Sequence, residues 1–263
     1  MVVVQEARYG SQSQPAGLVA GIVRRGHGVA VVDADATVLD LGVPSVVTTA
    51  GVLVARGRSH GVLTLLRLAE AWGVPTVNRA GAVEAVLDKA SMAVALARAG
   101  IPSPATFLGP TAALASDLPR RCFPLLLKPV RGDNAAGLRL IRSAAELRAL
   151  TWPESPALAQ CYLDTDGYDV KLYVIGEQVT AVRKASPLRG GGEPVPVPIT
   201  DRLAELARRC GRLFGLQLYG VDCLDTPDGP VVIEVNDFPN YSAVPDAGDR
   251  LASYVLDTVR RSG

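Results

Sequence analysis

The sequence has few of the residues that build soft-metal or disulfide sites. Its 263 residues include four cysteines and two histidines. The cysteines stand far apart and form no C-x-x-C pair, so no zinc cluster can be assembled from them. We expect four reduced thiols, as in a cytoplasmic protein, buried as small apolar side chains. They are Cys122, Cys161, Cys210 and Cys223.

A strong charge of either sign and a long apolar run are also absent. Lys+Arg number 27 and Asp+Glu number 26, so the net charge is +1. This balance gives no indication of binding to nucleic acid or to an anionic membrane surface. The apolar run at the start is too short for a signal peptide, and no later run reaches about 18 apolar residues. We therefore expect a cytoplasmic protein with neither kind of partner.

Lysine is scarce although basic residues are not. Of the 27 basic residues, 23 are arginine and four are lysine. Because arginine supplies the ordinary surface charge, the remaining lysines indicate positions that need a compact ammonium group on a flexible chain, unless their number reflects chance. They are Lys89, Lys128, Lys171 and Lys184.

Residues 1–78 alternate short apolar segments with helical patterns, which predicts an α/β unit with a parallel sheet. No G-x-G-x-x-G follows the first strand, so a nucleotide site is not indicated there. The expected strands cover 2–6, 29–35, 52–57 and 74–78, and the expected helices 14–28 and 62–73.

The remaining patterns predict mixed helices and antiparallel strands. Residues 189–198 are rich in glycine and proline and predict an irregular loop. Hairpins are expected at 169–185 and 218–236. The other expected elements are helices at 80–100, 200–215 and from 247, and strands at 122–130, 137–143 and 157–163.

Asp222, Glu234 and Asn236 form the strongest candidate site. Glu234 and Asn236 are two residues apart in a strand and share a face. A hairpin centred near Asp228 places Asp222 opposite Glu234, and cross-strand partners also share a face. Three oxygen donors of this kind suit Mg²⁺. The alternative is that the carboxylates lie on the solvent face of an antiparallel sheet.

Two lysines stand where phosphate groups could be held. Lys128 ends an apolar strand, and Gly132 and Gly137 bracket the short loop that follows. An ammonium group beside an amide-rich loop can hold phosphates, although the P-loop order is absent. Lys89 lies early in a helix with little charge. A strand end before an ordinary turn, and a solvated helix face, are the alternatives.

The order of these motifs resembles the ATP-grasp superfamily. The segments "LDKASMAVALARAGIPSPATF", "FPLLLKPVRG", "AQCYL", "GYDVKLYVIG", "YGVD" and "VIEVNDFPNY" run from about Asn78 to the C-terminal helix. They are most similar to the branch with ribosomal-protein glutamate ligases and the carrier-protein ligases of lysine biosynthesis. The resemblance implies an α/β fold with two α+β lobes around ATP, at 79–159 and 160–263, and a small parallel-sheet domain at 1–78.

The resemblance also implies a role for each matching residue. It implies ATP and two Mg²⁺ ions as cofactors, with Glu234 as their bridge and Mn²⁺ as a substitute. Lys89 and Lys128 match the residues that hold the phosphates, and Arg131, Gly132 and Gly137 match the loop that covers them. The residues that match the adenine contacts are Gln160, Cys161, Tyr162 and Leu163, and Asp169, with Lys171 beside it, matches the ribose side. The metal ligands match Asp222, Glu234 and Asn236. Arg183 matches a basic residue that faces the transferred phosphate and, with Lys128, is the predicted catalytic pair.

We expect an ATP- and Mg²⁺-dependent ligase that joins a small-molecule or peptide carboxylate to an amine or thiol through an acyl phosphate, releasing ADP and phosphate. Lys171 and "DFPNY" are also similar to inositol-phosphate kinases of the same superfamily, which is the second hypothesis. A non-catalytic ATP-binding protein is the third. The predicted substrate-binding residues are Arg56, Arg58, His60 and Arg189. No pattern indicates an oligomeric state.

Overall fold

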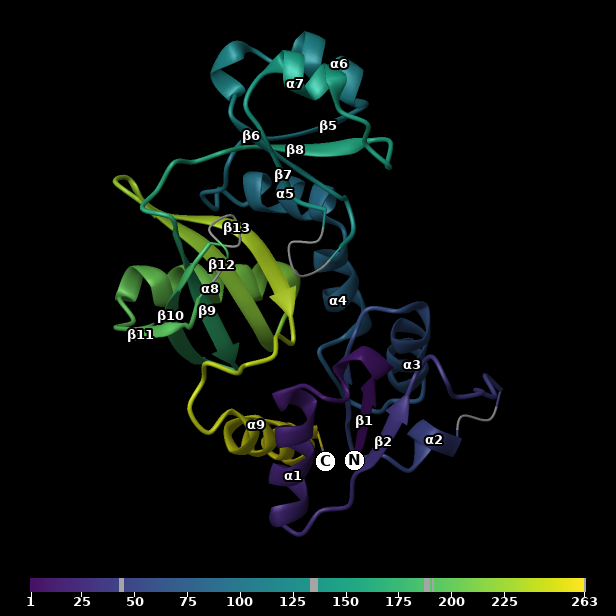
Figure 1. Cartoon of the computed structure of the whole chain (residues 1–263). Coiled ribbons are helices and arrows are strands. Elements are labelled where there is room, and N and C mark those ends of the chain that lie inside the picture. The colour runs from purple at the N-terminus through teal and green to yellow at the C-terminus, as the bar shows by residue number, and fades with distance from the viewer. Residues whose placement is uncertain (43–44, 133–136, 187–189, 191, 263) are drawn as a thin grey trace.

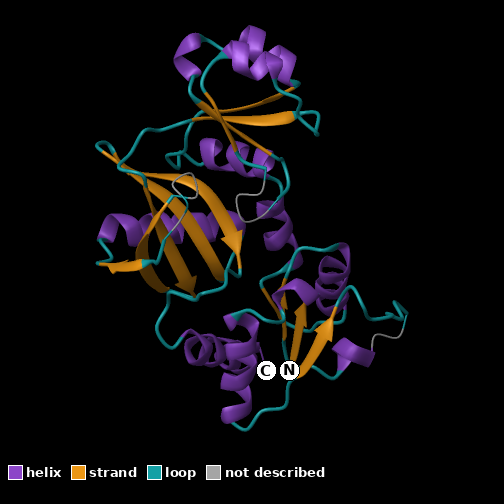
Figure 2. Cartoon of the chain, viewed as in Figure 1, coloured by secondary structure: helices purple, strands orange, loops and turns teal. Residues whose placement is uncertain are grey.

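The computed structural model describes residues 1–42, 45–132, 137–186, 190 and 192–262. Within these ranges the chain forms three separate sheets with helices packed on them (Figures 1 and 2). The predicted α/β fold is confirmed. No helix in the described part combines the length and apolar character needed to cross a membrane.

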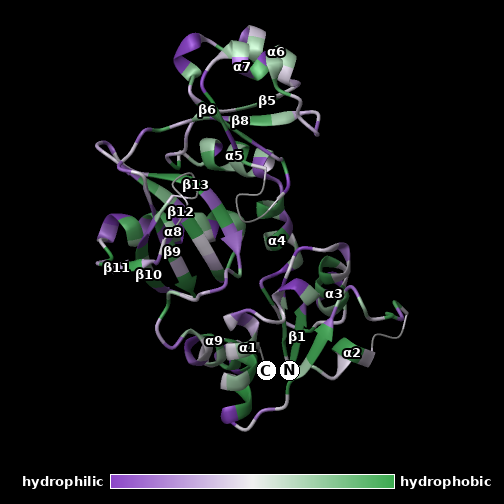
Figure 3. Cartoon of the chain, in the orientation of Figure 1, coloured by the Kyte–Doolittle hydropathy of each residue, from purple (hydrophilic) through white to green (hydrophobic). Residues whose placement is uncertain are grey.

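The N-terminal sheet is parallel, as the alternating pattern predicts. Its strands lie in the order β2-β1-β3-β4. They are β1 (Val2–Gln5), β2 (Ala30–Asp33), β3 (Leu53–Arg56) and β4 (Thr76–Val77). The helices of this region are η1 (Ala7–Tyr9), α1 (Ser13–Arg24), α2 (Ser45–Thr48) and α3 (His60–Ala71). The strands β1 and β2 are strongly apolar (Figure 3), and β1 is buried between helices.

The C-terminal helix α9 (Ala247–Ser262) packs against α1, so both ends of the chain build one layer (Figure 1). Glycines allow this close approach. A Cβ atom on Gly248 would lie 2.6 Å from the Gly17 carbonyl oxygen, and one on Gly21 would lie 2.8 Å from the Gly248 carbonyl oxygen. Leu18 and Leu251 are fully buried in the resulting core.

The predicted helix at 80–100 is two helices, α4 (Ala80–Leu87) and α5 (Lys89–Arg98). Asp88 interrupts them because its backbone is extended, and its side chain accepts a hydrogen bond from the Ser91 backbone N–H as the N-cap of α5. The Lys89 backbone N–H donates to the Val130 carbonyl at 3.0 Å. The break therefore places Lys89 beside the segment that follows β6.

The middle sheet is antiparallel, with the strand order β5-β8-β6-β7. Its buried face packs under α6 and α7 through Leu125, Leu127 and Leu147. The strands are β5 (Thr106–Gly109), β6 (Leu125–Lys128), β7 (Arg139–Ile141) and β8 (Ala157–Cys161). The helices are α6 (Thr111–Asp117), η2 (Arg120–Cys122) and α7 (Ala144–Ala149).

The third sheet is antiparallel, with the order β11-β10-β9-β12-β13, and both predicted hairpins are confirmed. Helix α8 (Asp201–Phe214) covers its outer face and is capped by Thr200, which accepts a hydrogen bond from the Leu203 backbone N–H. The prediction of an irregular loop at 189–198 is wrong for β11, because an edge strand tolerates its proline. The strands are β9 (Tyr168–Ile175), β10 (Gln178–Ala185), β11 (Val195–Val197), β12 (Leu218–Thr226) and β13 (Gly229–Asp237).

Candidate active site

One cavity of about 690 Å³ lies where the three sheets meet. The middle sheet contributes Lys128 and Gln160, the third sheet contributes Lys171 and Glu234, and the parallel sheet contributes Arg56. Residues from distant parts of the chain therefore converge on a single space. A cavity of this size is in the range of small-molecule sites.

All four lysines of the sequence line this cavity. Lys184 pairs with Asp169 across β10 and β9, and Lys171 pairs with Asp222 across β9 and β12. Because cross-strand partners share a face, these side chains belong to one face of the sheet. Lysine is thus placed at the cavity, whereas arginine supplies the rest of the positive charge.

The three oxygen donors Asp222, Glu234 and Asn236 all line the cavity. The turn at 227–228 aligns Thr226 with Gly229, and a β-bulge after Asp222 shifts the register by one residue, so that Asp222 lies opposite Glu234. Without the bulge, the turn would pair Asp222 with Ile233. The predicted convergence therefore depends on the bulge as well as on the turn.

Each of these oxygen donors contacts a cationic side chain from another element. Lys171 Nζ lies 2.8 Å from Asp222 Oδ2, and Lys89 Nζ lies 2.7 Å from Glu234 Oε1. The third cation is the Arg58 guanidinium, which donates a hydrogen bond to Asn236 Oδ1. Burial raises the pKa of Asp222 and the charge of Glu234 raises it further, while Lys171 opposes both effects. Each carboxylate is thus neutralised by a lysine in the free protein, so a metal ion would replace an ammonium group as its partner.

The donor set fits a hard cation. No group of three or more His, Cys, Asp or Glu side chains suited to a metal occurs in the described part of the chain. The candidate set instead combines two carboxylates with an amide oxygen, which are the ligand types that Mg²⁺ takes while keeping waters or phosphate oxygens. Asp222, Glu234 and Asn236 would hold such an ion.

Lys128, at the end of β6, and Lys89, at the start of α5, approach the same region. Lys128 Nζ donates to Gln160 Oε1 at 2.6 Å, and Lys89 Nζ donates to the Gly132 carbonyl at 2.7 Å. Burial lowers the pKa of Lys128, and Lys89 lowers it further, whereas Glu234 raises it. Two ammonium groups that interact in this way are suited to a polyanion.

The segment predicted to contact adenine also lines the cavity, through Gln160, Cys161, Tyr162 and Leu163. The backbone N–H groups of Cys161 and Tyr162 donate to the carbonyls of Ala105 and Pro124. Because these two N–H groups already donate within the protein, a backbone contact with adenine would need other backbone N–H or C=O groups of residues 160–163. Burial and the neighbouring Cys122 thiol raise the pKa of Cys161 to about 11.

Asp169, predicted on the ribose side, is buried and lines the cavity. Burial raises the pKa of its carboxyl group, and the Lys171 ammonium lowers it. A polar side chain in this position, beside Lys171 and Lys184, can accept a hydrogen bond from a bound hydroxyl group.

Several predicted residues lie elsewhere. Arg183 is on the opposite face of β10, where it pairs with Asp166 and stacks on Tyr168 at 4.1 Å. This placement gives no support to its predicted contact with phosphate, because strand alternation turns it away from Lys184. Among the described residues, the cavity lining does not include Arg131, Gly137 or His60. Arg189 lies outside the described residues.

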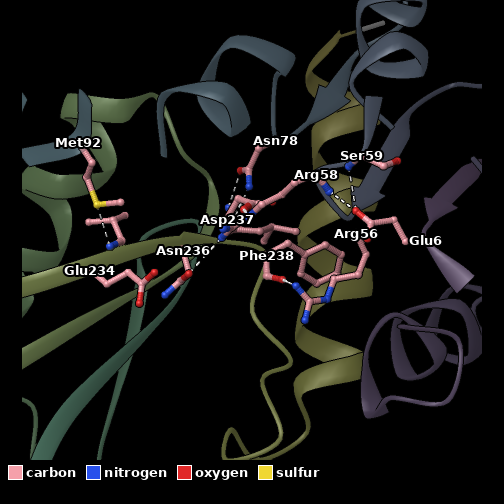
Figure 4. A network of polar contacts seen from close by, with 12 residues as sticks. Glu6, Arg56, Arg58, Ser59, Asn78, Met92, Glu234, Asn236, Asp237 and Phe238 are labelled. Carbon is pink, nitrogen blue, oxygen red and sulfur yellow. Dashed lines mark hydrogen bonds and ion pairs between the residues drawn. The ribbon is translucent and has the colours of Figure 1, made fainter. Parts of the chain in front are cut away.

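The two arginines at the end of β3 do line the cavity, but both contact protein groups. Arg56 donates to the Phe238 carbonyl (Figure 4). Its guanidinium carbon also stacks 4.0 Å from the centre of the Tyr9 ring, and it donates to Gln12. Arg58 pairs with Asp237. Asp237 and Tyr9 are cavity residues that the sequence patterns missed, and Lys184 was noted as a scarce lysine but was given no role in the site. For Lys184 the signal was present, because the hairpin turn aligns it with Asp169.

Comparisons with known proteins agree with this geometry. The family of RimK-like ATP-grasp domains matches residues 86–259. A probable alpha-L-glutamate ligase 1 from Shewanella amazonensis is 30% identical over 217 residues, covering 75% of this chain and 71% of the relative. One from Thioalkalivibrio sulfidiphilus is 31% identical over 216 residues, covering 74% and 72%.

A solved structure of similar fold is a RimK domain ATP-grasp protein from Sphaerobacter thermophilus, with a TM-score of 0.75, 25% identity and coverage of 97% of this chain and 100% of that one. The ATP-grasp ligase PsnB, complexed with a minimal precursor, Mg and ADP, has a TM-score of 0.76 at 18% identity, covering 99% and 98%. The chain therefore belongs to the RimK-like ATP-grasp family and is an ATP-dependent ligase.

Proposed function

We propose that this protein joins a carboxylate of a small molecule or peptide to an amine, or to a thiol, through an acyl phosphate, with release of ADP and phosphate. The observation that carries the proposal is the meeting of four lysines with Asp222, Glu234 and Asn236 in one cavity. Positive groups for a triphosphate and oxygen donors for its metal ion are thus side by side, and the relatives are named as ligases.

In this proposal, Asp222, Glu234 and Asn236 hold Mg²⁺, the ion present in the PsnB complex. When bound, Mg²⁺ neutralises charge on the phosphate oxygens. Two ions with Glu234 between them, and replacement by Mn²⁺, remain parts of the proposal. Lys89 and Lys171 contact the same carboxylates in the free protein, and their ammonium groups are then released toward the nucleotide.

The chemical step needs positioning more than covalent catalysis. An oxygen of the substrate carboxylate attacks the γ-phosphorus of ATP, the bond to the ADP oxygen breaks, and an acyl phosphate forms. The amine then attacks the acyl carbon, and phosphate leaves with the bonding electrons. Lys128 and Lys184 stabilise charge on the phosphoryl oxygens from two sides of the cavity. In this proposal, Lys184 has the role that the family resemblance implied for Arg183.

The contacts of the arginines favour a ligase over an inositol-phosphate kinase. A polyanionic acceptor needs several cations that can turn toward it. Arg56 and Arg58 instead donate to Phe238, Gln12 and Asp237. The cavity lining on this side also carries Tyr9 and Pro239, which suits an acceptor of lower charge.

The four free cysteines support the predicted cytoplasmic location.

Trapping of the intermediate tests the proposal. The protein is incubated with ATP, Mg²⁺ and hydroxylamine together with a panel of acids that includes L-glutamate and short peptides, the first choice because the relatives are named as glutamate ligases. We expect ADP release that depends on one class of acid, and a hydroxamate of that acid by mass spectrometry. Stable transfer of phosphate to a hydroxyl group, with no hydroxamate from any acid, would contradict the proposal.

A further inference from the structure

The candidate metal ligand Asn236 is reached by a residue that lies 178 positions earlier in the chain. Arg58 Nη2 donates to Asn236 Oδ1 at 3.0 Å (Figure 4). Asp222 and Glu234 meet lysines of β9 and α5, whereas Asn236 meets an arginine of the parallel-sheet region. The N-terminal part of the chain therefore contacts the metal site directly.

Hydrogen bonds to a buried carboxylate fix the backbone at Arg58. Glu6, at the end of β1, is buried and accepts hydrogen bonds from the backbone N–H groups of Arg58 and Ser59. Gly57 makes this possible: its φ is +141°, and a Cβ atom there would lie 2.5 Å from Glu6 Oε1. The carboxylate thus fixes the three-residue link between β3 and α3, and the Arg58 side chain starts from a defined backbone.

The charge of Arg58 is balanced locally. Its Nε lies 2.5 Å from Asp237 Oδ1, and the two side chains are 10% and 2% exposed. A buried guanidinium without a counterion would repel a divalent cation at the neighbouring Asn236. The pair of Arg58 with Asp237 adds no net charge beside the oxygen donors. Its effect on Asn236 is therefore to fix the direction in which the amide oxygen points.

We propose that Arg58 is a positioning residue that sets the orientation of Asn236 for the metal ion, a role that rests on the proposed function. An asparagine amide presents oxygen at one end and NH₂ at the other, and only the oxygen ligates a cation. Arg58 has only donors, so it selects the oxygen end. The amide oxygen has two lone pairs, and one remains for the ion. Asp237 supports this arrangement by neutralising Arg58.

The sequence-based hypothesis assigned Arg58 to the substrate, and the two roles predict different measurements. A substrate contact affects the KM of the acid. A positioning contact affects the Mg²⁺ dependence of nucleotide binding, even when no acid is present. Titration of ADP at a series of Mg²⁺ concentrations by calorimetry measures the second property without catalysis.

The decisive variant is Arg58→Met with Asp237→Asn. Arg58→Met alone leaves a buried carboxylate, which attracts Mg²⁺ and hides the loss of orientation. The double variant keeps the pair neutral. We expect the Mg²⁺ concentration for half-maximal enhancement of ADP binding to rise about tenfold or more, as for other groups that orient metal ligands, with unchanged ADP binding in the absence of Mg²⁺.

Controls separate the possible failures. Arg8→Gln removes a 51% exposed arginine that pairs with the same Glu6 carboxylate, and we expect it to leave the Mg²⁺ dependence unchanged. Glu234→Gln should abolish the dependence; if it does not, the metal site of the proposed function is wrong. If the double variant does not fold, Arg58→Lys replaces it, because one ammonium group cannot reproduce both contacts of the guanidinium. An Mg²⁺ dependence within twofold of the original, in a folded Arg58 variant, would overturn the role of Arg58.

Discussion

Replacement of Lys128 by methionine should weaken nucleotide binding while leaving the fold intact. The side chain is partly buried at the end of β6, and its ammonium group donates to Gln160 Oε1. Methionine has a similar length and no charge, so the desolvation cost of the ammonium group disappears together with one hydrogen bond. These effects oppose each other, and we expect the free energy of unfolding without ligand to change by about 1 kcal/mol or less.

The loss in binding follows from the contact that the charge makes with phosphate. A hydrogen bond from a charged group contributes about 1.5–3 kcal/mol, which corresponds to an increase of about 10- to 150-fold in Kd. Calorimetric titration with Mg²⁺ and a non-hydrolysable ATP analogue measures this change. Arg121→Met is the control, because Arg121 is exposed on the same lobe and is not part of the cavity lining. An unchanged Kd for Lys128→Met would refute the assignment of Lys128 to phosphate.

The effect of Lys128 on stability and on nucleotide binding should change with pH in a definite direction. Burial lowers the pKa of Lys128 in the folded protein, with Lys89 adding to this effect and Glu234, Asp222 and Asp169 opposing it. Burying the ammonium group lowers the free energy of unfolding, and this cost is fully present at a pH below the pKa of Lys128 in the folded protein. It disappears as the pH rises from the folded pKa to the unfolded value. Binding follows the protonated form, so the advantage of Lys128 over methionine should decrease as the pH rises above the pKa of the free protein.

Three further predictions test other parts of the structure. Gly248→Ala should cost about 1–3 kcal/mol, because its Cβ would lie 2.6 Å from the Gly17 carbonyl oxygen; Gly81→Ala, in a helix with open space, should be neutral or stabilising by up to about 1 kcal/mol by thermal unfolding. Alkylation of Cys161 by iodoacetamide should accelerate about tenfold per pH unit up to its pKa of about 11, and a rate that levels off near pH 9 would be evidence against this burial. Acetic anhydride should modify all four lysines in the free protein and none with Mg²⁺ and ATP; unprotected lysines by mass spectrometry would remove them from the site.

Most of the elements, and many residues that line the candidate site, could be predicted because local patterns determine them. Alternation of apolar residues located the hairpins, and the order of motifs identified the ATP-grasp fold. The pairing of Asp222 with Glu234 was also predicted, although the β-bulge that produces it left no signal in the sequence. A bulge adds one residue to a strand without a fixed residue type, so the turn alone gives the wrong partner.

Other features depend on tertiary contacts. The break at Asp88 follows from a cap that competes with continuation of an alanine-rich helix, and helix propensity alone favours one long helix. The pairing of Arg58 with Asp237 joins residues 179 positions apart, and no local pattern indicates it. The placement of Lys184, and not Arg183, at the cavity is different. Adjacent residues of a strand point to opposite faces, so the sequence alone is enough to separate the two side chains.

The most direct test of the account is the fate of the carboxylate oxygen. The acid identified by the hydroxylamine screen is labelled with ¹⁸O in its carboxyl group and incubated with ATP, Mg²⁺ and the amine. If the carboxylate attacks the γ-phosphorus, one labelled oxygen leaves with the phosphate, and mass spectrometry finds phosphate heavier by about two mass units, as the balance of an acyl phosphate requires. Unlabelled phosphate, released at the rate of product formation, would contradict carboxylate activation in this cavity.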